Sequence, residues 1–445
     1  MRRRAAASVP YLVWLLVVIS LVPWRKGVYY EGGADAVVLA KAALQALAFL
    51  LAAARVFSVP RRPLGVRSFL LLGLFASLSL TGALQAGSMA SSGVLTGRLV
   101  LLAVTVGCVL AAERAHQALT SLLVVMGAVG LAIGATGAPA VLDGARLAGT
   151  MPEVAPNVLA LLLGAPAVAA LHVLIRHRPA PGPVIAAVLL VPALIATGSR
   201  MGLLAAAAAV TVDLLYVRRP HKALVAVLAA TVPALLAVVA FTPVLSALME
   251  RAGGGSLMTL NSRTIAWSAV LDAAPGTWKR WIGSGLDVRT VPVQGQYWDS
   301  QVLDSSWISA LAQAGILGAV VLALLTLAAL AGAVRYRGQG AGLVPALLVF
   351  VLVRSFLENG LTEAAPAFVL FFLLALMVEP PARDAAAPPP AGSPPAVARP
   401  VWTPAAAAAV VPPPAGWRAA PLHPVPASPN RLPTPLSSAS LSPGP

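Results

Sequence analysis

The sequence consists of long apolar runs separated by short segments that carry most of its charged residues. A helix needs about 20 apolar residues to cross the hydrocarbon core of a bilayer, and about twelve runs of roughly this length occur before residue 380. Only 10% of the 445 residues are charged, whereas a soluble domain carries about 25%. This pattern excludes an ordinary soluble protein and predicts an all-α, polytopic membrane protein with about 12 transmembrane helices.

The apolar runs can be ordered across a membrane by the charge of the loops between them. Their approximate limits are 9–24, 36–57, 67–86, 94–112, 117–138, 154–175, 183–198, 200–217, 223–243, 305–334, 341–359 and 364–379. Basic residues concentrate on cytoplasmic loops, and here every second loop carries at least one of them. We therefore expect a multi-pass protein of the plasma membrane with both termini in the cytoplasm. One long extracytoplasmic loop is expected over about 245–304.

The pair of spans on either side of Ser199 and Arg200 is the least separated. Both could form one long hydrophobic stretch if Arg200 were ignored. A single span would place the basic loops before and after it on opposite sides of the membrane. We therefore treat 183–198 and 200–217 as two helices.

The net charge of +16 has to be interpreted together with the 59% hydrophobic content. In a soluble chain such a charge would suggest nucleic-acid binding. In this chain the lipid bilayer is the expected partner, because basic loops are attracted to anionic lipid, and no nucleic-acid partner is expected. The single cysteine, Cys108, excludes an intramolecular disulfide.

The last 66 residues differ in composition from the rest of the chain, because 20 of the 39 prolines follow Glu379. A segment rich in proline and alanine cannot bury a core and is typical of a disordered or polyproline-like extension. The predicted domains are therefore a transmembrane helical domain at 1–379 and a disordered cytoplasmic tail at 380–445. We interpret the tail as a spacer; a docking segment is the alternative.

A few charged residues lie toward the predicted outer end of the spans. The orientation of the spans in the membrane depends on the basic cytoplasmic loops and does not explain these residues. Arg98 is either an interfacial anchor or part of a site. For Arg354, we expect an ion pair with Glu358 at the i, i+4 spacing. Arg200 follows a small-residue turn at the predicted start of a helix, where free N–H groups and a guanidinium together favour an anion.

The predicted outer loop contains a second arginine and most of the tryptophans. Asn261 and Ser262 resemble helix-capping residues, so we expect a short surface helix with Arg263 in its first turn. An arginine beside the positive end of a helix suggests a nearby anion. Five of the nine tryptophans lie between residues 267 and 307. Trp267, Trp298 and Trp307 can stack on sugars, although interfacial anchoring or packing explains each one as well.

Four segments, taken in order, resemble the O-antigen ligase and polymerase family of polytopic glycan transferases. They are Arg146–Gly149 with Pro156–Ala160, then Thr197–Gly202, then Arg263–Trp267 with Gly283–Leu286, and finally Asp304–Ile308 leading to Gln313–Gly318. The resemblance covers about residues 95–375 and depends on their order, spacing and side of the membrane together.

The resemblance implies an all-helical membrane glycosyltransferase of the GT-C type, acting in cell-surface polysaccharide assembly. Such enzymes move a glycan from an undecaprenyl-diphosphate carrier to a hydroxyl of an acceptor glycan or glycolipid at the outer face, and they use no metal or nucleotide-sugar cofactor. By this resemblance Arg200, Arg263 and Arg146 bind the diphosphate. Preorganised arginines can stabilise the charge that grows on the departing diphosphate.

The chain departs from the family pattern at the expected catalytic base. The family shows a histidine at the end of the outer loop, whereas this chain has Asp304 followed by Ser305. A carboxylate must then accept the proton, and Asp304 is the first candidate, with Glu153 and Asp299 behind it. Alternatively, Asp304 serves only to cap the following helix.

Two further functional classes remain open from the sequence. Twelve spans with both ends inside is also a common plan for a transporter or a flippase of lipid-linked glycan. That class favours two related halves and charges deep in the bundle, and no similarity between halves is visible. The missing histidine leaves open a non-catalytic relative that binds lipid-linked glycan.

Overall fold

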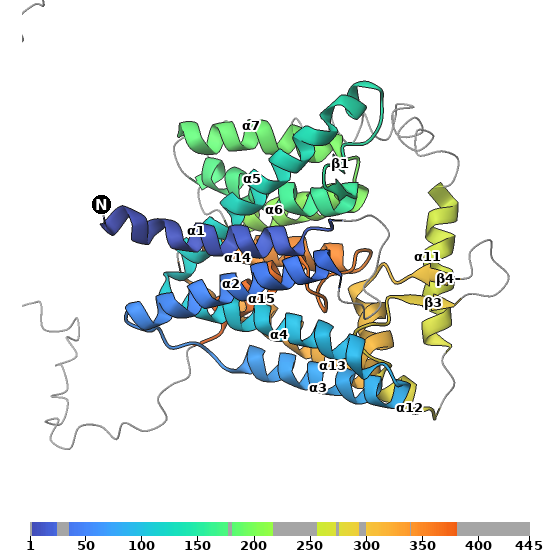
Figure 1. The fold of residues 1–445 in the computed structure, drawn as a ribbon. Coiled ribbons are helices and arrows are strands. Elements are labelled where there is room, and N and C mark those ends of the chain that lie inside the picture. Colours follow the sequence, from blue (N-terminus) through green and yellow to red (C-terminus); the bar gives the residue numbers. More distant parts are fainter. Residues whose placement is uncertain are drawn as a thin grey trace, which may run out of the picture. The chain divides into compact units, whose positions relative to one another are not determined.

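The computed structural model describes residues 2–24, 35–176, 180–216, 256–272, 276–292, 300–338 and 340–380. It is mainly helical (Figure 1). The helices are α1 (Arg2–Leu21), α2 (Ala36–Ser58), α3 (Arg67–Ala86), α4 (Met89–Ala112), α5 (Ala115–Leu142), α6 (Pro156–Arg176), α7 (Pro181–Ala196), α8 (Arg200–Leu215), α11 (Ser256–Leu271), α12 (Trp278–Ile282), α13 (Ser306–Arg335), α14 (Leu343–Ser355) and α15 (Pro366–Val378). The strands are β1 (Gly149–Thr150), β2 (Glu153–Val154), β3 (Thr290–Pro292) and β4 (Ser300–Val302).

The helices agree closely with the spans expected from the apolar runs. Eleven of those spans coincide with a helix, and the expected span at 223–243 lies outside the described residues. Among the described residues, six helices are long and apolar enough to cross a membrane, judged by length and composition. The chain therefore has the character of a polytopic membrane protein, while the total of about twelve spans stays a prediction.

The fold is mainly helical as expected, and the described residues add two short antiparallel hairpins between helices, which the sequence did not predict. Gly149 pairs with Val154 in the first hairpin, and Thr290 pairs with Val302 in the second. Each hairpin holds two segments together where the chain returns between helices. The apolar periodicity that identifies long helices gives no signal for such short pairings.

The core of the bundle is centred on α15, which is apolar on every face. Almost all of its residues are buried, including Phe368, Phe371 and Phe372. It packs against α3, α4, α5, α6, α13 and α14. A helix that is hydrophobic all round requires such a surrounded position. The loops at the two ends of α14 and α15 are thereby fixed relative to the other helices.

A sharp turn separates α7 from α8, as expected. Gly198 adopts a left-handed backbone conformation with φ of 59°, which glycine tolerates without steric penalty. Ser199 caps α8, because its hydroxyl accepts a hydrogen bond from the Gly202 backbone N–H at 3.2 Å. The backbone N–H of Leu147 donates to the Ala196 carbonyl at 2.8 Å, which attaches the β1 segment to this turn.

The segment from α12 to β4 is attached to the first half of α13. Gly315 interrupts α13 with φ of 68°, and a side chain there would collide with the backbone of Trp281. Beyond α12, the N–H groups of Ser284 and Gly285 donate to carbonyls of α13 at 2.9 and 3.0 Å. This attachment places Asp304 and Ser306, at the start of α13, near the loop that follows α14.

The predicted domain boundary at residues 379 and 380 stays a prediction. Residues 381–445, which make up nearly all of the predicted tail, lie outside the described part of the chain.

Candidate functional site

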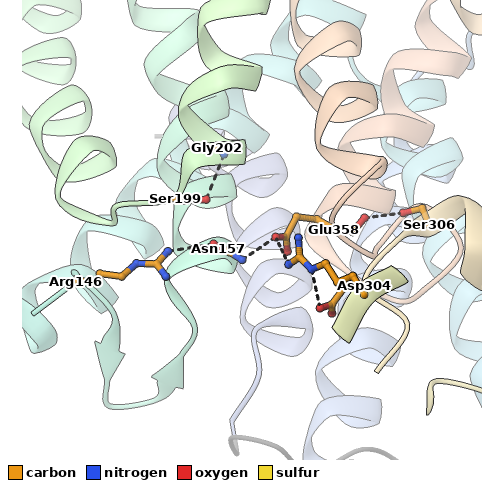
Figure 2. Close-up of polar contacts among 8 residues, drawn as sticks. Arg146, Asn157, Ser199, Gly202, Asp304, Ser306 and Glu358 are labelled. Atoms are coloured by element: carbon orange, nitrogen blue, oxygen red, sulfur yellow. Dashed lines mark hydrogen bonds and ion pairs between the residues drawn. The ribbon is translucent and has the colours of Figure 1, made fainter. Parts of the chain in front are cut away.

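Polar side chains from six segments gather at one end of the helix bundle, and Figure 2 shows Arg146, Asn157, Asp304 and Glu358 among them. They are Arg146 from the loop before β1, Asn157 from the first turn of α6, Arg200 from the start of α8, Arg263 from α11, Asp304 from the segment before α13, and Glu358 from the loop after α14. We call these six residues the arginine–carboxylate cluster. Five of the six are linked by hydrogen bonds or ion pairs, and Arg200 interacts electrostatically with Arg146.

Arg146 is held against the turn between α7 and α8. Its Nε donates a hydrogen bond to the Thr197 carbonyl at 2.9 Å, and its Nη2 donates to Asn157 Oδ1 at 3.3 Å. Partial burial and the like charge of Arg200 lower the pKa of the Arg146 guanidinium, and Glu358 raises it. Two cations placed this close favour an anion between or beside them.

Asn157 connects Arg146 to Glu358, although the latter two lie far apart in the sequence. The Asn157 side-chain amide accepts from Arg146 through its oxygen and donates through Nδ2 to Glu358 Oε1 at 2.7 Å. Figure 2 shows this connection as a continuous line of contacts across the site. Asn157 thereby fixes the direction of both charged side chains.

Arg263 lies between the two carboxylates of the cluster. Its Nε donates to Asp304 Oδ2 at 3.2 Å, and its Nη2 lies 3.7 Å from Glu358 Oε1. The two carboxylates differ in exposure, because the Asp304 side chain is 43% exposed and that of Glu358 only 16%. One arginine therefore contacts a solvated carboxylate and a largely buried one.

Burial raises the pKa of the Glu358 carboxyl above its usual value. Arg354, Arg263 and Arg146 oppose this effect, and the negative charge of Asp304 adds to it. A carboxylate with a raised pKa is a stronger base than an exposed one. Among the carboxylates of the cluster, Glu358 is therefore the better suited to accept a proton.

Ser306 holds the Glu358 loop against α13. Its hydroxyl donates to the Glu358 carbonyl at 3.1 Å and accepts from the Leu361 N–H at 3.2 Å. Deeper in the same interface, the Thr362 hydroxyl donates to Gln313 Oε1 at 3.1 Å. The position of Glu358 is thus set by α13 as well as by its own loop.

The expected pairing of Arg354 with Glu358 occurs as an electrostatic interaction without a direct ion pair. Helix α14 ends at Ser355 and Glu358 lies in the loop that follows, although its backbone N–H still donates to the Arg354 carbonyl at 2.8 Å. The Glu358 carboxylate contacts Asn157 and Arg263 instead, and its interaction with buried Arg354 is electrostatic only. Sequence reasoning therefore missed Glu358 as a site residue. Its only signal was an acidic residue near a predicted outer span end.

Two predictions about helix starts were wrong. Helix α11 begins at Ser256 and not beside Asn261, so Arg263 is the eighth residue of the helix and lies outside its first turn. The segment 256–260 continues the helical pattern toward the N-terminus, since it contains apolar residues and no glycine or proline. The N-cap of α13 is Ser305, so the alternative that Asp304 caps this helix does not hold.

The other candidate residues do not join the cluster in the described structure. Glu153 lies in β2 with an exposed side chain, and no side-chain contact joins it to another described residue. Asp299 and Trp298 lie outside the described residues.

The Trp307 indole donates to Ser355 Oγ at 3.0 Å and stacks on Phe356, which is a packing role. Trp267 lies one helical turn beyond Arg263, and its buried indole N–H has no acceptor in the described structure.

The described residues contain no group of three or more histidine, cysteine, aspartate or glutamate side chains arranged to hold a metal ion. The described histidines lie away from the cluster. His116 is in the first turn of α5, and His172 contacts Asp213 near the far ends of α6 and α8. The chemistry of the cluster is thus that of arginine, asparagine and carboxylate groups.

A family model described as O-antigen ligase matches residues 185–323. This range contains Arg200, Arg263 and Asp304, whereas Arg146, Asn157 and Glu358 lie outside it. The match confirms the resemblance to the O-antigen ligase and polymerase family and supports a ligase- or polymerase-like function in general. Comparison with curated proteins gave no match.

Proposed function

We propose that the protein transfers a glycan from an undecaprenyl-diphosphate carrier to a hydroxyl of an acceptor glycan or glycolipid at the outer face of the plasma membrane. The observation that carries this proposal is the convergence of three arginines and two carboxylates at one end of a bundle of apolar helices. Such a cluster at the end of transmembrane helices suits a substrate with a membrane-embedded tail and an anionic head.

The arginines are the groups that would bind the carrier diphosphate. Guanidinium groups bind phosphate oxygens with paired, charge-assisted hydrogen bonds. Arg200 is exposed and adjoins Arg146, and Arg263 faces them from α11 across Asn157 and Glu358. As the bond to the sugar breaks, negative charge grows on the diphosphate, and arginines already in place stabilise that charge.

We assign the general base to Glu358 and a positioning role to Asp304. Glu358 is largely buried and has a raised pKa, so it can take a proton from a sugar hydroxyl. Asp304 accepts a hydrogen bond from Arg263 Nε and so orients that guanidinium. Asp304 as the base is the alternative, and Glu153 and Asp299 rank below both.

The proposed reaction has a simple balance of bonds and charge. The acceptor oxygen forms a bond to the anomeric carbon of the glycan, while the bond from that carbon to the phosphate oxygen breaks. The electron pair of the broken bond leaves with the carrier diphosphate, and the acceptor proton passes to the carboxylate of Glu358. The proton is then released to solvent, which restores the base.

Trp267 is the tryptophan that we propose contacts the glycan. It lies four residues after Arg263 and therefore on the same face of α11. Its indole N–H lacks an acceptor in the described structure, and a sugar hydroxyl would provide one. Trp298 stays a candidate from the sequence, and Trp307 is engaged in packing.

A gene-deletion experiment distinguishes the candidate functions. Surface polysaccharide and lipid-linked intermediates are compared in cells with and without the gene. Accumulation of carrier-linked glycan at the outer face is the expected result for a ligase, and shortened surface chains are expected for a polymerase. Accumulation on the cytoplasmic side would contradict the proposal and favour a flippase, while unchanged polysaccharide would favour a non-catalytic relative.

A pair of variants separates the two candidate bases. Glu358→Gln removes the base but keeps an oxygen that accepts from Asn157, so transfer should fall by about 100-fold or more. Asp304→Asn should keep a larger share of the activity, because it removes only an orienting contact. Transfer is measured with purified protein in nanodiscs, and Asp272→Asn, an exposed residue at the end of α11, is the control. A greater loss in Asp304→Asn than in Glu358→Gln would assign the base to Asp304.

A further inference from the structure

A second group of basic side chains is joined to the loop that carries Glu358 through an ion pair between Arg289 and Glu363. Lys41 comes from α2, Arg98 from α4, and Arg289 from the segment between α12 and β3. Lys41 interacts electrostatically with both arginines. Gln45, one turn beyond Lys41 in α2, accepts a hydrogen bond from Arg98 Nε at 3.2 Å. We call Lys41, Gln45, Arg98 and Arg289 the second cationic cluster.

The residues from α2 and α4 lie in an environment that disfavours charge. Both helices are among those long and apolar enough to cross a membrane. Basic residues within such helices are costly and usually belong to a site or a pathway. Arg98 bonds to Gln45, which is only 1% exposed, so Arg98 does not serve as an outward-reaching interfacial anchor.

Two hydrogen-bond donors of this cluster are buried without an acceptor in the described structure. They are Gln45 Nε2 and Arg289 Nε. A buried donor without an acceptor is unfavourable, and like charges nearby add to the cost. Asp35 and Glu363 offset part of the positive charge, and Glu363 Oε2 lies 3.6 Å from Arg289 Nη2. An oxyanion would supply both the missing acceptors and the missing charge.

The loop after α14 contacts both basic groups. Glu358 contacts the arginine–carboxylate cluster, and Glu363, five residues later, contacts Arg289 of the second cluster. Asp287, two residues before Arg289, is attached to the start of α4, because Ser88 and Ser91 donate to the Asp287 carboxylate at 3.0 Å each. An anion bound to the second cationic cluster would thus be a neighbour of the proposed diphosphate site and distinct from it.

We propose that Lys41, Gln45, Arg98 and Arg289 form a second anion-binding site, which takes a phosphate ester of the acceptor or of an anionic phospholipid. The evidence for the site is the pair of buried donors without an acceptor and the three basic side chains of the second cationic cluster. Its assignment to the acceptor rests on the proposed function, since transfer requires an acceptor beside the donor. A phosphate held at this site would orient the acceptor toward Glu358.

Native mass spectrometry can test this site without any transfer reaction. Full-length protein is released from nanodiscs after incubation with glucose 6-phosphate, or with glucose as the neutral probe. A second arm compares nanodiscs of phosphatidylcholine with nanodiscs that also contain phosphatidylglycerol. The number of bound molecules is counted for the wild type and for the double variant Lys41→Gln/Arg98→Gln.

The expected result is that the double variant loses one bound phosphate-containing molecule relative to the wild type, while glucose binds neither protein. Loss of glucose 6-phosphate assigns the site to an acceptor phosphate, and loss of phosphatidylglycerol alone assigns it to a lipid headgroup. Unchanged binding of both probes would overturn the proposal. Arg55→Gln is the matched control, because Arg55 lies near the other end of α2 and pairs with Glu113 at 3.0 Å.

A charge-preserving variant guards against misfolding of the double variant. Lys41→Arg/Arg98→Lys keeps both positive charges and should retain the bound phosphate, at an affinity reduced by about tenfold at most. Loss of phosphate binding in Lys41→Gln/Arg98→Gln, with retention in Lys41→Arg/Arg98→Lys, supports an electrostatic site. Equal loss in both, with unchanged melting temperatures, would overturn it. Arg200→Gln tests the diphosphate site separately. A failure of the proposed function can therefore be distinguished from a failure of the second anion-binding site.

Discussion

Helices α6 and α8 carry a group of charged side chains at each of their two ends. At one end lies the arginine–carboxylate cluster, with Asn157 from α6 and Arg200 from α8. At the other end, His172 and Arg176 from α6 meet Asp213 from α8, and we call these three the aspartate clamp. Both groups join the same helices, but they differ in exposure and in charge balance.

The carboxylate of the aspartate clamp is closed off from solvent. The Asp213 side chain is 2% exposed, and its carboxylate lies 2.9 Å from His172 Nδ1 and 3.2 Å from Arg176 Nη2. Gly342, just before α14, fits against this group, since a side chain there would collide with Arg176 and Asp213. The carboxylate is thus surrounded by its own protein partners, and the group links α6, α8 and the start of α14.

The arginine–carboxylate cluster is open by comparison. Its three arginines face two carboxylates, Arg146 and Arg200 are exposed, and Asp304 is nearly half exposed. Excess positive charge at the end of apolar helices is typical of a site for an anion. Burial of a charged group alone therefore does not indicate function. What matters is whether the protein itself satisfies the charge.

The largest free-energy change is expected from breaking the aspartate clamp. Asp213→Ala leaves Arg176 without its buried carboxylate, which should cost about 3–5 kcal/mol of stability. The melting temperature in detergent should fall clearly, whereas the folded fraction should retain its specific transfer activity. Asp272→Ala, at an exposed aspartate, should leave the melting temperature unchanged. A stable but inactive Asp213→Ala protein would contradict the structural role.

Removing an arginine of the arginine–carboxylate cluster should reduce transfer activity more than stability, which is the opposite of the effect expected for Asp213→Ala. Arg200→Ala and Arg263→Ala should each reduce glycan transfer by about 100-fold or more, because the charge on the departing diphosphate loses its stabilisation. In Arg200→Ala, membrane insertion and melting temperature should stay near those of the wild type, since Arg200 is exposed. Full transfer activity in both variants would refute the assignment of these residues to diphosphate binding.

The pH dependence of transfer should report on Glu358. The base must be ionised, so activity should rise with pH through its pKa, which burial places above the ordinary value of about 4.3. In Asp304→Asn the half-maximal pH should move lower, because loss of that negative charge makes Glu358 easier to ionise. The measurement is the initial rate between about pH 4 and pH 8. A half-maximal pH that is identical in both proteins would argue against Glu358 as the base.

The smallest effect is expected from the proline-rich tail. Truncation after Arg383 removes a segment that is predicted to act as a spacer, so transfer activity should be unchanged. The comparison uses equal amounts of membrane-inserted protein, with the full chain as reference. Loss of activity in the truncated protein would show that the tail takes part in docking or assembly.

Part of the candidate site could be predicted from the sequence, and part could not. Arg200 was identifiable because a charged residue interrupts two apolar runs at a small-residue turn. Arg146 and Arg263 were identifiable through the family resemblance. Glu358 was paired only with Arg354 from the sequence, because its contact Asn157 is 201 positions away and no local pattern joins them. The second cationic cluster was equally hidden, since it combines two helices and a loop.

The sequence by itself determined the helices of this protein and their membrane character, because apolar length and interrupting charges are local properties. It also determined which charged residues require an explanation other than orientation. Only the tertiary structure decided how those residues combine. Asn157 joins Arg146 to Glu358, and one short loop directs Glu358 and Glu363 to different basic groups. Such pairings depend on where helix ends meet in space, and that position follows from the packing of the whole bundle around α15.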